Sequence, residues 1–375
     1  MTEIRKIRRC PGCGVILQSI DETLPGYVPE KHLAKHEVVI CQRCFKLQHY
    51  GEDIAPKEPR VNEEFLRILD QAKAENALII YVLDLFSFDS SFSPEINEKI
   101  QHLDIIGVAN KRDLFPKSVK DEKLREYVLK RTEKAGLKVD ALVIASPLKK
   151  YNIDELKSEI EARRLGRNVY VIGATSSGKS SLVNAYMKQF MNMTQVPITT
   201  SPFPGTTLRV IEIPLDDSSR LFDTPGYVID SSLLSLVERD VIRTIVPRTE
   251  IKPRTYQLSP KQSVIVGGLA RFDFMLGKMT GFTFYVSNLV ELKRTALVNA
   301  DKTFDSLVSK NKIRPTSKIV KGFGDLEAFE VDILDKGKLD IGIVGLGWVT
   351  FTASKQRIRI LAPKGVHIFV QAAKI

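Results

Sequence analysis

The stretch GATSSGKSSL, Gly173 to Leu182, constrains the fold of this chain more than any other feature. An apolar run, Val169 to Ile172, precedes it, and a segment with helical periodicity follows it. In the pattern GxxxxGKS, the glycines let main-chain N–H groups wrap phosphates, the lysine reaches the β- and γ-phosphates, and the serine hydroxyl ligates Mg²⁺. A strand before and a helix after are the context that this pattern requires. The stretch therefore predicts a phosphate-binding loop in an α/β domain, with candidate nucleotide contacts at Gly173, Ser176, Ser177, Gly178, Lys179, Ser180 and Ser181.

Two short elements follow the loop in the order that a phosphate site needs. DTPG, Asp223 to Gly226, comes directly after the strand RLF. We expect Asp223 to hold Mg²⁺ through water and the Gly226 amide to bind the γ-phosphate. Between loop and strand, PFPGTTL supplies Thr206 and Thr207, either of which could close over Mg²⁺; we favour Thr207. The predicted catalytic residues are Lys179, Thr207 and Gly226.

The tetrapeptide NKRD, Asn110 to Asp113, ends the apolar strand DIIGVAN. An aspartate carboxylate accepts hydrogen bonds from N1–H and the exocyclic amine of guanine, a pattern that adenine lacks. Such a buried polar pair rejects the wrong base by orders of magnitude. NKRD alone is also a common turn, but its place at a strand end of the same domain favours base recognition. We expect Asp113 to select GTP over ATP, Asn110 to hold the loop and the Lys111 stem to lie along the base.

The order of these elements is unusual, because in an ordinary GTPase the base-recognition element follows the phosphate loop. A doubly wound sheet binds its ligand at the carboxyl ends of its strands, so the place of each strand in space matters more than its order in the chain. A circular permutation would form the same pocket in the order base, phosphate, switch. The segment after DTPG would then lead, through a helix from Ser232 to about Val246, directly into the next domain.

Four cysteines form two CxxC pairs near the N-terminus. Two such knuckles can close a tetrahedral four-thiolate zinc site, because each short loop points two thiolates at one ion. The alternatives are a redox pair or disulfides, which the lack of a βαβ context and a reducing compartment disfavour. The predicted zinc ligands are Cys10, Cys13, Cys41 and Cys44.

The chain length and the positions of its turn-forming and linker segments predict three domains. Residues 1–54 form the zinc domain, residues 55–247 an α/β GTPase domain with a mostly parallel sheet covered on both faces, and residues 248–375 a β-rich domain. In the last of these, DKGK and PKG are predicted turns, at Asp335 to Lys338 and Pro363 to Gly365. No apolar run approaches the length of a membrane span, and the basic N-terminus lacks an apolar signal core, so we expect a cytoplasmic protein without a membrane partner.

The formal net charge of +11 suits a partner that carries phosphates, although a solvated basic surface is an equal alternative. Arg357 and Arg359 alternate with isoleucines and would share one face of a strand, with Lys355, Lys364 and His367 nearby in sequence. Aromatic residues in the predicted strands of this domain could stack on bases. Because these strands must bury one face, we favour a place for the aromatic side chains in the hydrophobic core. They are Phe272, Phe274, Phe282, Phe284 and Tyr285.

These motifs together resemble the circularly permuted GTPases, and among them the YqeH family of bacterial ribosome-assembly GTPases. The resemblance covers essentially the whole chain and includes CPGCG, NKRD, GATSSGKSSL, TTSPFPGTTL, FDTPG, KPRTYQL, GGLARFDF, GLGWVT and APKGVHIFV. It implies a role in small (30S) subunit biogenesis through rRNA or precursor contacts. It also implies a C-terminal domain likened to a tryptophan-operon RNA-binding attenuation protein.

Three residues depart from the family pattern. Ser176 stands where an asparagine helps to hold potassium, which makes potassium stimulation doubtful. The base-contacting turn is ASPL, in which Ser146 is a candidate contact, but Pro147 lacks the N–H that would meet the guanine oxygen. Selectivity then depends more on Asp113, or the Leu148 amide substitutes. Tyr227 stands where well-known GTPases have the glutamine that orients the attacking water; this replacement is shared with the wider permuted class and predicts slow intrinsic turnover.

We therefore expect a GTPase switch that uses GTP, Mg²⁺ and Zn²⁺. Its GTP form would bind a ribosomal precursor, and slow hydrolysis would release it. The main alternative is a constitutive RNA-binding scaffold whose nucleotide pocket is structural. A metabolic P-loop kinase is a weaker alternative, because no acceptor-substrate site is evident in the sequence.

Overall fold

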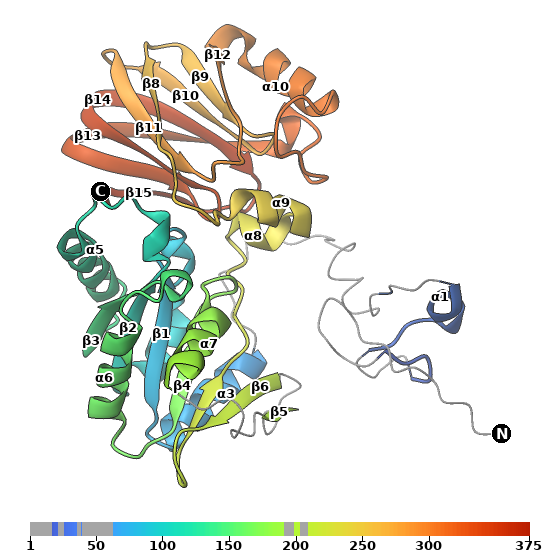
Figure 1. Ribbon diagram of the computed structural model, residues 1–375. Coiled ribbons are helices and arrows are strands. Elements are labelled where there is room, and N and C mark those ends of the chain that lie inside the picture. The colour runs from blue at the N-terminus through green and yellow to red at the C-terminus, as the bar shows by residue number, and fades with distance from the viewer. Residues whose placement is uncertain (1–16, 22–25, 36–38, 40–62, 191–198, 203–208) are drawn as a thin grey trace. The chain divides into compact units, whose positions relative to one another are not determined.

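A seven-stranded sheet carries the predicted phosphate loop in a computed structural model of the chain (Figure 1). The structure describes residues 17–21, 26–35, 39, 63–190, 199–202 and 209–375, with only the main chain at 199–202, 209, 335 and 336. The strand order is β3-β2-β1-β4-β7-β6-β5. The strands are β1 (Leu78–Asp84), β2 (Ile105–Asn110), β3 (Ala141–Ile144), β4 (Val169–Ile172), β5 (Thr199–Pro202), β6 (Arg209–Pro214) and β7 (Arg220–Asp223).

Strands β3, β2, β1, β4 and β7 are parallel, while β6 and β5 extend the sheet antiparallel. The three strands that precede the loop strand β4 in the chain lie on one side of it, and the three that follow lie on the other. The carboxyl ends of β2, β4 and β7, which carry NKRD, the phosphate loop and DTPG, therefore point to one edge of the sheet. This arrangement is the permuted α/β fold that the motif order predicts.

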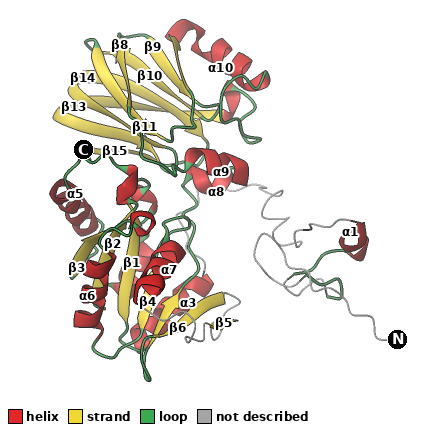
Figure 2. Cartoon of the chain, viewed as in Figure 1, coloured by secondary structure: helices red, strands yellow, loops and turns green. Residues whose placement is uncertain are grey.

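Helices cover both faces of this sheet (Figure 2). They are α3 (Glu63–Ala74), α4 (Pro94–Ile100), α5 (Asp121–Lys134), α6 (Ile153–Arg164) and α7 (Lys179–Phe190). Every residue of β1 is buried, and the side chains alternate between two apolar cores. Tyr81 lies in the core with α3, α4 and α5, and Val82 lies in the core with α6 and α7. Alternation across a strand buried on both faces explains the continuous apolar sequence of β1.

A second, eight-stranded sheet follows. Its main path is β12-β9-β10-β14-β11-β8, and β13 pairs with β14 and β15. The elements are β8 (Arg254–Leu258), β9 (Gln262–Val266), β10 (Ala270–Leu276), β11 (Thr280–Val286), β12 (Leu292–Ala296), α10 (Ala300–Ser309), β13 (Leu326–Ile343), β14 (Gly347–Pro363) and β15 (Ile368–Ala372). All described pairings in this sheet are antiparallel.

Two predicted local structures are wrong. Asp335 to Lys338 is not a hairpin turn, because β13 continues through it: Ile333 pairs with Gln356 and Lys336 with Ser354, so the strand holds a β-bulge. The helix predicted from Ser232 to Val246 is two short helices, α8 (Leu233–Leu236) and α9 (Arg239–Ile245). Helix α10 and strand β12 were not predicted.

The break between α8 and α9 comes from a contact distant in sequence. Val237 and Glu238 are extended between the two helices. The Glu238 carboxylate accepts hydrogen bonds from the Ser317 hydroxyl at 2.7 Å and from the Lys318 main-chain N–H at 2.7 Å. These bonds anchor the break to the β-rich region.

The contacts divide the chain into two units, Met1–Lys57 and Glu58–Ile375. The described part of the first unit contains the short helix α1 (Glu30–Lys35) and a bridge between Gln18 and Tyr27. The four predicted zinc ligands lie outside the described residues. The boundaries of the three predicted domains stay predictions.

Candidate functional site

The phosphate loop connects β4 to α7, as its sequence predicts. Lys179 is the first residue of α7 and is 6% exposed. Its Nζ donates hydrogen bonds to the Gly173 carbonyl at 2.8 Å and the Ala174 carbonyl at 3.1 Å. Burial lowers the pKa of Lys179 to about 8, against the opposing effect of the Asp223 charge. The loop thus holds a buried cation beside its own carbonyl groups, at the positive end of a helix.

Asp223 ends β7 and lies beside this lysine. The carboxylate is buried, and burial raises its pKa, while a hydrogen bond from the Ser180 hydroxyl and the Lys179 charge lower it. Its Oδ1 is buried without a hydrogen-bond partner in the described part of the structure. A carboxylate with a free oxygen beside a serine hydroxyl fits the oxygen ligand set of Mg²⁺. Thr206 and Thr207, the other predicted magnesium and switch residues, lie outside the described residues.

DTPG lies directly against the phosphate loop. The Thr175 main-chain N–H donates to the Tyr227 carbonyl at 2.7 Å, and the Thr175 hydroxyl donates to the same oxygen at 3.0 Å. A Cβ at Gly226 would come within 2.8 Å of the Thr175 Cα and 2.9 Å of the Lys179 Nζ. Only glycine therefore fits at Gly226 in this arrangement.

Tyr227 is turned away from the loop and is 3% exposed. Its hydroxyl lies 2.8 Å from the Tyr81 hydroxyl and 2.6 Å from the Ser91 carbonyl oxygen. Burial raises the pKa of Tyr227 well above its ordinary value. The side chain that replaces the water-orienting glutamine is thus a core residue in this structure.

The base-recognition segment touches the phosphate loop. Asn110 Nδ2 donates to the Ser177 carbonyl at 2.7 Å. A Cβ on Gly178, whose φ is +97°, would come within 2.3 Å of the same Nδ2, so glycine is required there. The Ser146 hydroxyl donates to Asp113 Oδ1 at 2.6 Å, which joins the ends of β2 and β3. The structure therefore brings Asn110, Asp113, Ser146 and the loop together at one edge of the sheet.

A short helical turn follows Ser146. Pro147 begins a short 3-10 helix, η3 (Pro147–Lys149), and the Lys149 amide already donates to Ser146. Leu148, whose amide is the predicted substitute donor to guanine, is 70% exposed at this turn. Its role stays a prediction.

Asp84, at the end of β1, was missed by sequence reasoning. Its Oδ2 accepts a hydrogen bond from Lys111 Nζ at 2.6 Å, and the two side chains are 7% and 17% exposed. Lys111 has a left-handed φ of 67°. A carboxylate at the end of a buried parallel strand, next to the strand that carries NKRD, was the available signal.

The candidate RNA-binding arginines are both paired. Arg357 Nε donates to Asp332 Oδ1 at 2.7 Å, and Arg359 Nε donates to Asp273 Oδ2 at 2.9 Å. The phenylalanines considered as stacking platforms, Phe272, Phe274, Phe282 and Phe284, are at most 2% exposed, which confirms the core interpretation.

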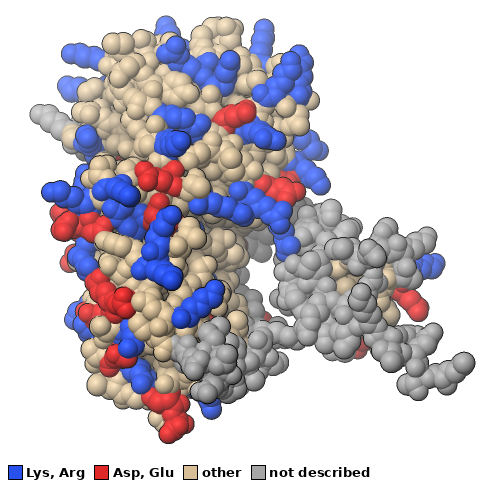
Figure 3. All heavy atoms as spheres, in the orientation of Figure 1, with Lys and Arg blue, Asp and Glu red and all other residues tan. Residues whose placement is uncertain are grey.

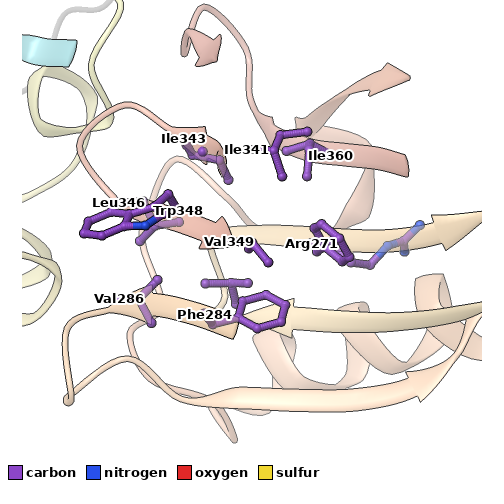
Figure 4. Close-up of a pocket in the computed structure, with 13 residues that line it drawn as sticks. Arg271, Phe284, Val286, Ile341, Ile343, Leu346, Trp348, Val349 and Ile360 are labelled. Carbon is purple, nitrogen blue, oxygen red and sulfur yellow. The ribbon is translucent and has the colours of Figure 1, made fainter. Parts of the chain in front are cut away.

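Figure 4 shows side chains that line a small cavity in the β-rich region. The cavity there measures about 20 Å³, room for about one water molecule, and apolar side chains line most of it. Among the described residues, no cluster of three His, Cys, Asp or Glu side chains could hold a metal ion, and no helix has the length and apolarity to cross a membrane. The zinc site stays a prediction.

Comparison with known proteins gives the following similarities. A family model described as YqeH-like, C-terminal, matches residues 279–374, and one described as 50S ribosome-binding GTPase matches residues 168–266. The chain is 38% identical to YqeH of Bacillus subtilis (strain 168), covering 98% of this chain and 99% of that protein. It is 27% identical to NO-associated protein 1, chloroplastic/mitochondrial, of Arabidopsis thaliana, covering 91% and 69%. YjeQ of Thermotoga maritima, a solved structure, is 25% identical over 40% of this chain and 47% of that one, with a TM-score of 0.25.

Proposed function

Since the chain belongs to the YqeH family of circularly permuted GTPases, we propose that it is a GTP-dependent switch in assembly of the small ribosomal subunit. As a member of this family, the protein hydrolyses GTP. The GTP-bound form binds a precursor of the subunit, and hydrolysis releases it. The observation that carries this proposal is the direct bonding of the segment after DTPG to the β-rich region.

Two main-chain hydrogen bonds join the two parts directly, and a third lies beside them within the β-rich region. The Leu233 amide donates to the Val344 carbonyl at 2.9 Å, the Val344 amide to the His367 carbonyl at 3.1 Å, and the His367 amide to the Ser231 carbonyl at 2.8 Å. Ser231 lies five positions after Gly226 in the sequence. A movement of DTPG on γ-phosphate binding would therefore pull on the turn between β13 and β14. The switch and the β-rich region are mechanically joined by a few residues.

At the phosphates, Lys179 would supply positive charge and Gly226 the main-chain N–H toward the γ-phosphate. Ser180 and, through water, Asp223 would hold Mg²⁺, which would supply neutralisation of the charge that develops on the phosphates. Tyr227 cannot orient the attacking water from its buried position. Slow intrinsic turnover follows, and Thr207 is the proposed residue that closes the site.

We place the RNA contact on β12, α10 and the loop that follows. Figure 3 shows Lys and Arg side chains gathered on the side of the β-rich region where Figure 1 places β12 and α10. A hollow of about 360 Å³ there includes Lys293 and Lys312 in its lining. Exposed cations that can reach phosphates dominate the affinity of proteins for nucleic acid. The exposed basic residues are Lys293, Arg294, Lys302, Lys310, Lys312, Arg314, Lys318 and Lys321.

The N-terminal unit would add a second contact surface, built around zinc held by Cys10, Cys13, Cys41 and Cys44. Four thiolates form a closed site, so the metal would be structural and not catalytic. We expect the purified protein to contain one zinc ion per chain. Replacement of both Cys41 and Cys44 by serine should abolish zinc binding. Absence of bound zinc from the intact protein would remove this part of the proposal.

Co-sedimentation with separated small and large ribosomal subunits tests the function. The experiment uses a non-hydrolysable GTP analogue and then GDP, at moderate salt. Small-subunit pelleting that depends on the GTP form supports the proposal. The matched family model carries a 50S description, so preference for the large subunit is the specific contrary outcome. Equal pelleting with both subunits in all nucleotide states would indicate indiscriminate phosphate binding or a constitutive scaffold.

Two charge reversals locate the RNA surface in the same assay. Lys312→Glu changes an exposed lysine in the proposed surface, and we expect subunit binding to weaken about tenfold. Arg357→Glu is the matched control on the same domain, because this arginine is already paired with Asp332. Equal losses in both variants would contradict the proposed location.

A further inference from the structure

Lys374, one residue before the end of the chain, is buried beside the GTPase sheet. It is 2% exposed, and its Nζ donates to the Leu85 carbonyl at 2.9 Å. The same ammonium lies 4.1 Å from the centroid of the Trp348 ring. Its main-chain N–H donates to Asp340 Oδ2 at 2.8 Å. A buried lysine needs such partners, because an unpaired charge away from water is costly.

Leu85 belongs to the loop that follows β1. Its amide donates to the Asn110 carbonyl at 3.1 Å, the last bond before NKRD diverges from the strand. The next amide, that of Phe86, donates to Asp84 Oδ1 at 2.9 Å. The other carboxylate oxygen of Asp84 holds Lys111. Both oxygens of one buried carboxylate are thus used, one by the loop and one by the base-recognition lysine.

Trp348 of β14 completes the contact from the other side. Its ring packs against Phe86, with centroids 5.6 Å apart, and against Phe115, 6.1 Å apart. It also stacks on Tyr285 of β11 at 5.0 Å, with the ring planes 6° apart. In Figure 4, Trp348 lies beside Leu346, which precedes β14. The β-rich region therefore holds the loop after β1 through both a cation and an indole ring.

We propose that Asp84 and Lys374 are positioning residues for the guanine base. Asp84 fixes the Lys111 ammonium so that the lysine stem lies along the base plane. Lys374 and Trp348 fix the loop whose Phe86 amide orients Asp84. The guanine pocket is then completed by the β-rich region, although no residue of that region touches the nucleotide. This inference rests on the proposed placement of Lys111 against the base.

Coupling of this kind is reciprocal. If docking of the β-rich region favours guanine binding, then guanine binding favours that docking by the same factor. The base would stabilise the C-terminal contact, while the γ-phosphate acts on the separate contact at Leu233 and Val344. The two ends of one nucleotide would therefore reach the β-rich region by two different routes.

Equilibrium titrations with GDP and with inorganic tripolyphosphate, both with Mg²⁺, test the proposal. Tripolyphosphate probes the phosphate side of the pocket without a base. Asp84→Asn and Lys374→Met should each weaken GDP binding about tenfold, the size expected when a charge-assisted hydrogen bond that aligns a ligand contact is lost. Tripolyphosphate affinity should stay within twofold. Equal losses for both probes would overturn the proposal in favour of a general structural role.

Two controls match the chemistry of these changes. Asp104→Asn breaks an ion pair with Arg167 at the start of β2, the opposite end of the strand from NKRD. Lys364→Met removes an exposed lysine between β14 and β15. Neither should change the affinity for either probe. A tenfold effect of either control on GDP alone would overturn the proposal, because changes far from the base would then have the effect assigned to Asp84 and Lys374.

Lys111→Met separates failure of the inference from failure of the site assignment. If this variant leaves GDP affinity unchanged, Lys111 does not contact the base and the site assignment fails. If it weakens GDP binding, Asp84→Asn should add little in the Lys111→Met background, because both changes remove the same contact. A full additional tenfold loss would overturn the positioning role of Asp84.

If Lys374→Met does not fold, hydrogen exchange in the intact protein tests the proposed role of Lys374. GDP should slow exchange of the Lys374 main-chain amide, which is bonded to Asp340, and tripolyphosphate should not. Equal exchange of this amide with GDP, tripolyphosphate or no ligand would overturn the proposed coupling.

Discussion

The main-chain N–H of Thr175 in the phosphate loop donates a 2.7 Å hydrogen bond to the carbonyl oxygen of Tyr227, the residue that follows DTPG. This bond closes DTPG against the loop. The site of a Cβ on Gly226 lies 2.9 Å from the Lys179 Nζ, which leaves no room for a phosphate between them. For a γ-phosphate to be bound by both groups, the Lys179 side chain or DTPG has to move. In the proposed switch, movement of DTPG away from the loop is the first structural change.

Gly226→Ala tests this apposition. The added methyl group would meet main-chain atoms of Thr175 at 2.8–2.9 Å, which cannot yield as a flexible side chain does. We expect GTP hydrolysis to slow at least ~10-fold, as when one donor to a developing charge is lost, with GDP affinity within about threefold. Single-turnover assays and GDP titrations measure the two effects. Gly324→Ala is the control, because a Cβ there meets no atom within 4 Å; unchanged hydrolysis in Gly226→Ala would contradict the assignment.

Tyr227→Phe tests whether this side chain takes part in hydrolysis. The change removes a buried hydroxyl that contacts Tyr81 and the Ser91 carbonyl. We expect the free energy of unfolding to fall by about 1 kcal/mol, the usual net value of one such bond, and the hydrolysis rate to stay within twofold. Urea unfolding and single-turnover kinetics provide the measurements. A tenfold slower reaction would mean that the hydroxyl reaches the nucleotide in another conformation.

The depressed pKa of Lys179 predicts opposite pH trends for binding and stability. In the free protein this pKa is about 8, against an ordinary 10.5. Phosphates need the charged lysine, so tripolyphosphate affinity should fall as the pH rises from 7 to 9. Over the same rise the unfolded chain holds the proton more tightly than the folded chain, so this group makes folding more favourable as the pH approaches 10.5. A phosphate affinity that is flat across this range would contradict the assignment.

Asp113→Asn should exchange guanine preference for xanthine preference. Xanthine carries an oxygen in place of the exocyclic amine of guanine, and an amide can donate to it where a carboxylate cannot. We expect GDP affinity to fall at least ~100-fold and xanthosine diphosphate affinity to rise. Ser146→Ala, which removes the 2.6 Å bond to Asp113 and the 3.2 Å bond from the Lys149 amide, should weaken GDP binding severalfold without that exchange. If GDP binds Asp113→Asn as it binds the parent, Asp113 does not contact the base.

The sequence predicts the parts of this fold that depend on short-range patterns. The phosphate loop, NKRD and DTPG were placed at strand ends because apolar runs and amphipathic helices alternate between Leu78 and Asp223. The periodicity of apolar residues and the glycines at strand ends predict these elements from nearby residues alone. The common pocket could also be predicted despite the permuted order of the motifs, because a doubly wound sheet brings the carboxyl ends of its strands to one edge.

The errors and the features that sequence reasoning missed arose where distant contacts decide the local structure. The helix after Ser232 breaks because Glu238 bonds Ser317 and Lys318, which lie about eighty positions away. The Tyr227 side chain is buried in the core, where its hydroxyl contacts the Tyr81 hydroxyl and donates to the Ser91 carbonyl. The role inferred for Asp84 depends on Lys374, at the far end of the chain. None of these pairs leaves a periodic signal in the sequence.

The most direct test of the switch is hydrogen exchange of the amides of Leu233, Val344 and His367 in the intact protein, with a non-hydrolysable GTP analogue and with GDP. The Leu233 and His367 amides donate the bonds that join the segment after DTPG to the β-rich region, and the Val344 amide donates to the His367 carbonyl beside them. We predict that their exchange differs at least ~10-fold between the two nucleotide states, because the γ-phosphate moves DTPG and changes the local opening of this contact. Exchange that differs at the phosphate loop but is identical at all three amides would contradict transmission of the nucleotide state to the β-rich region.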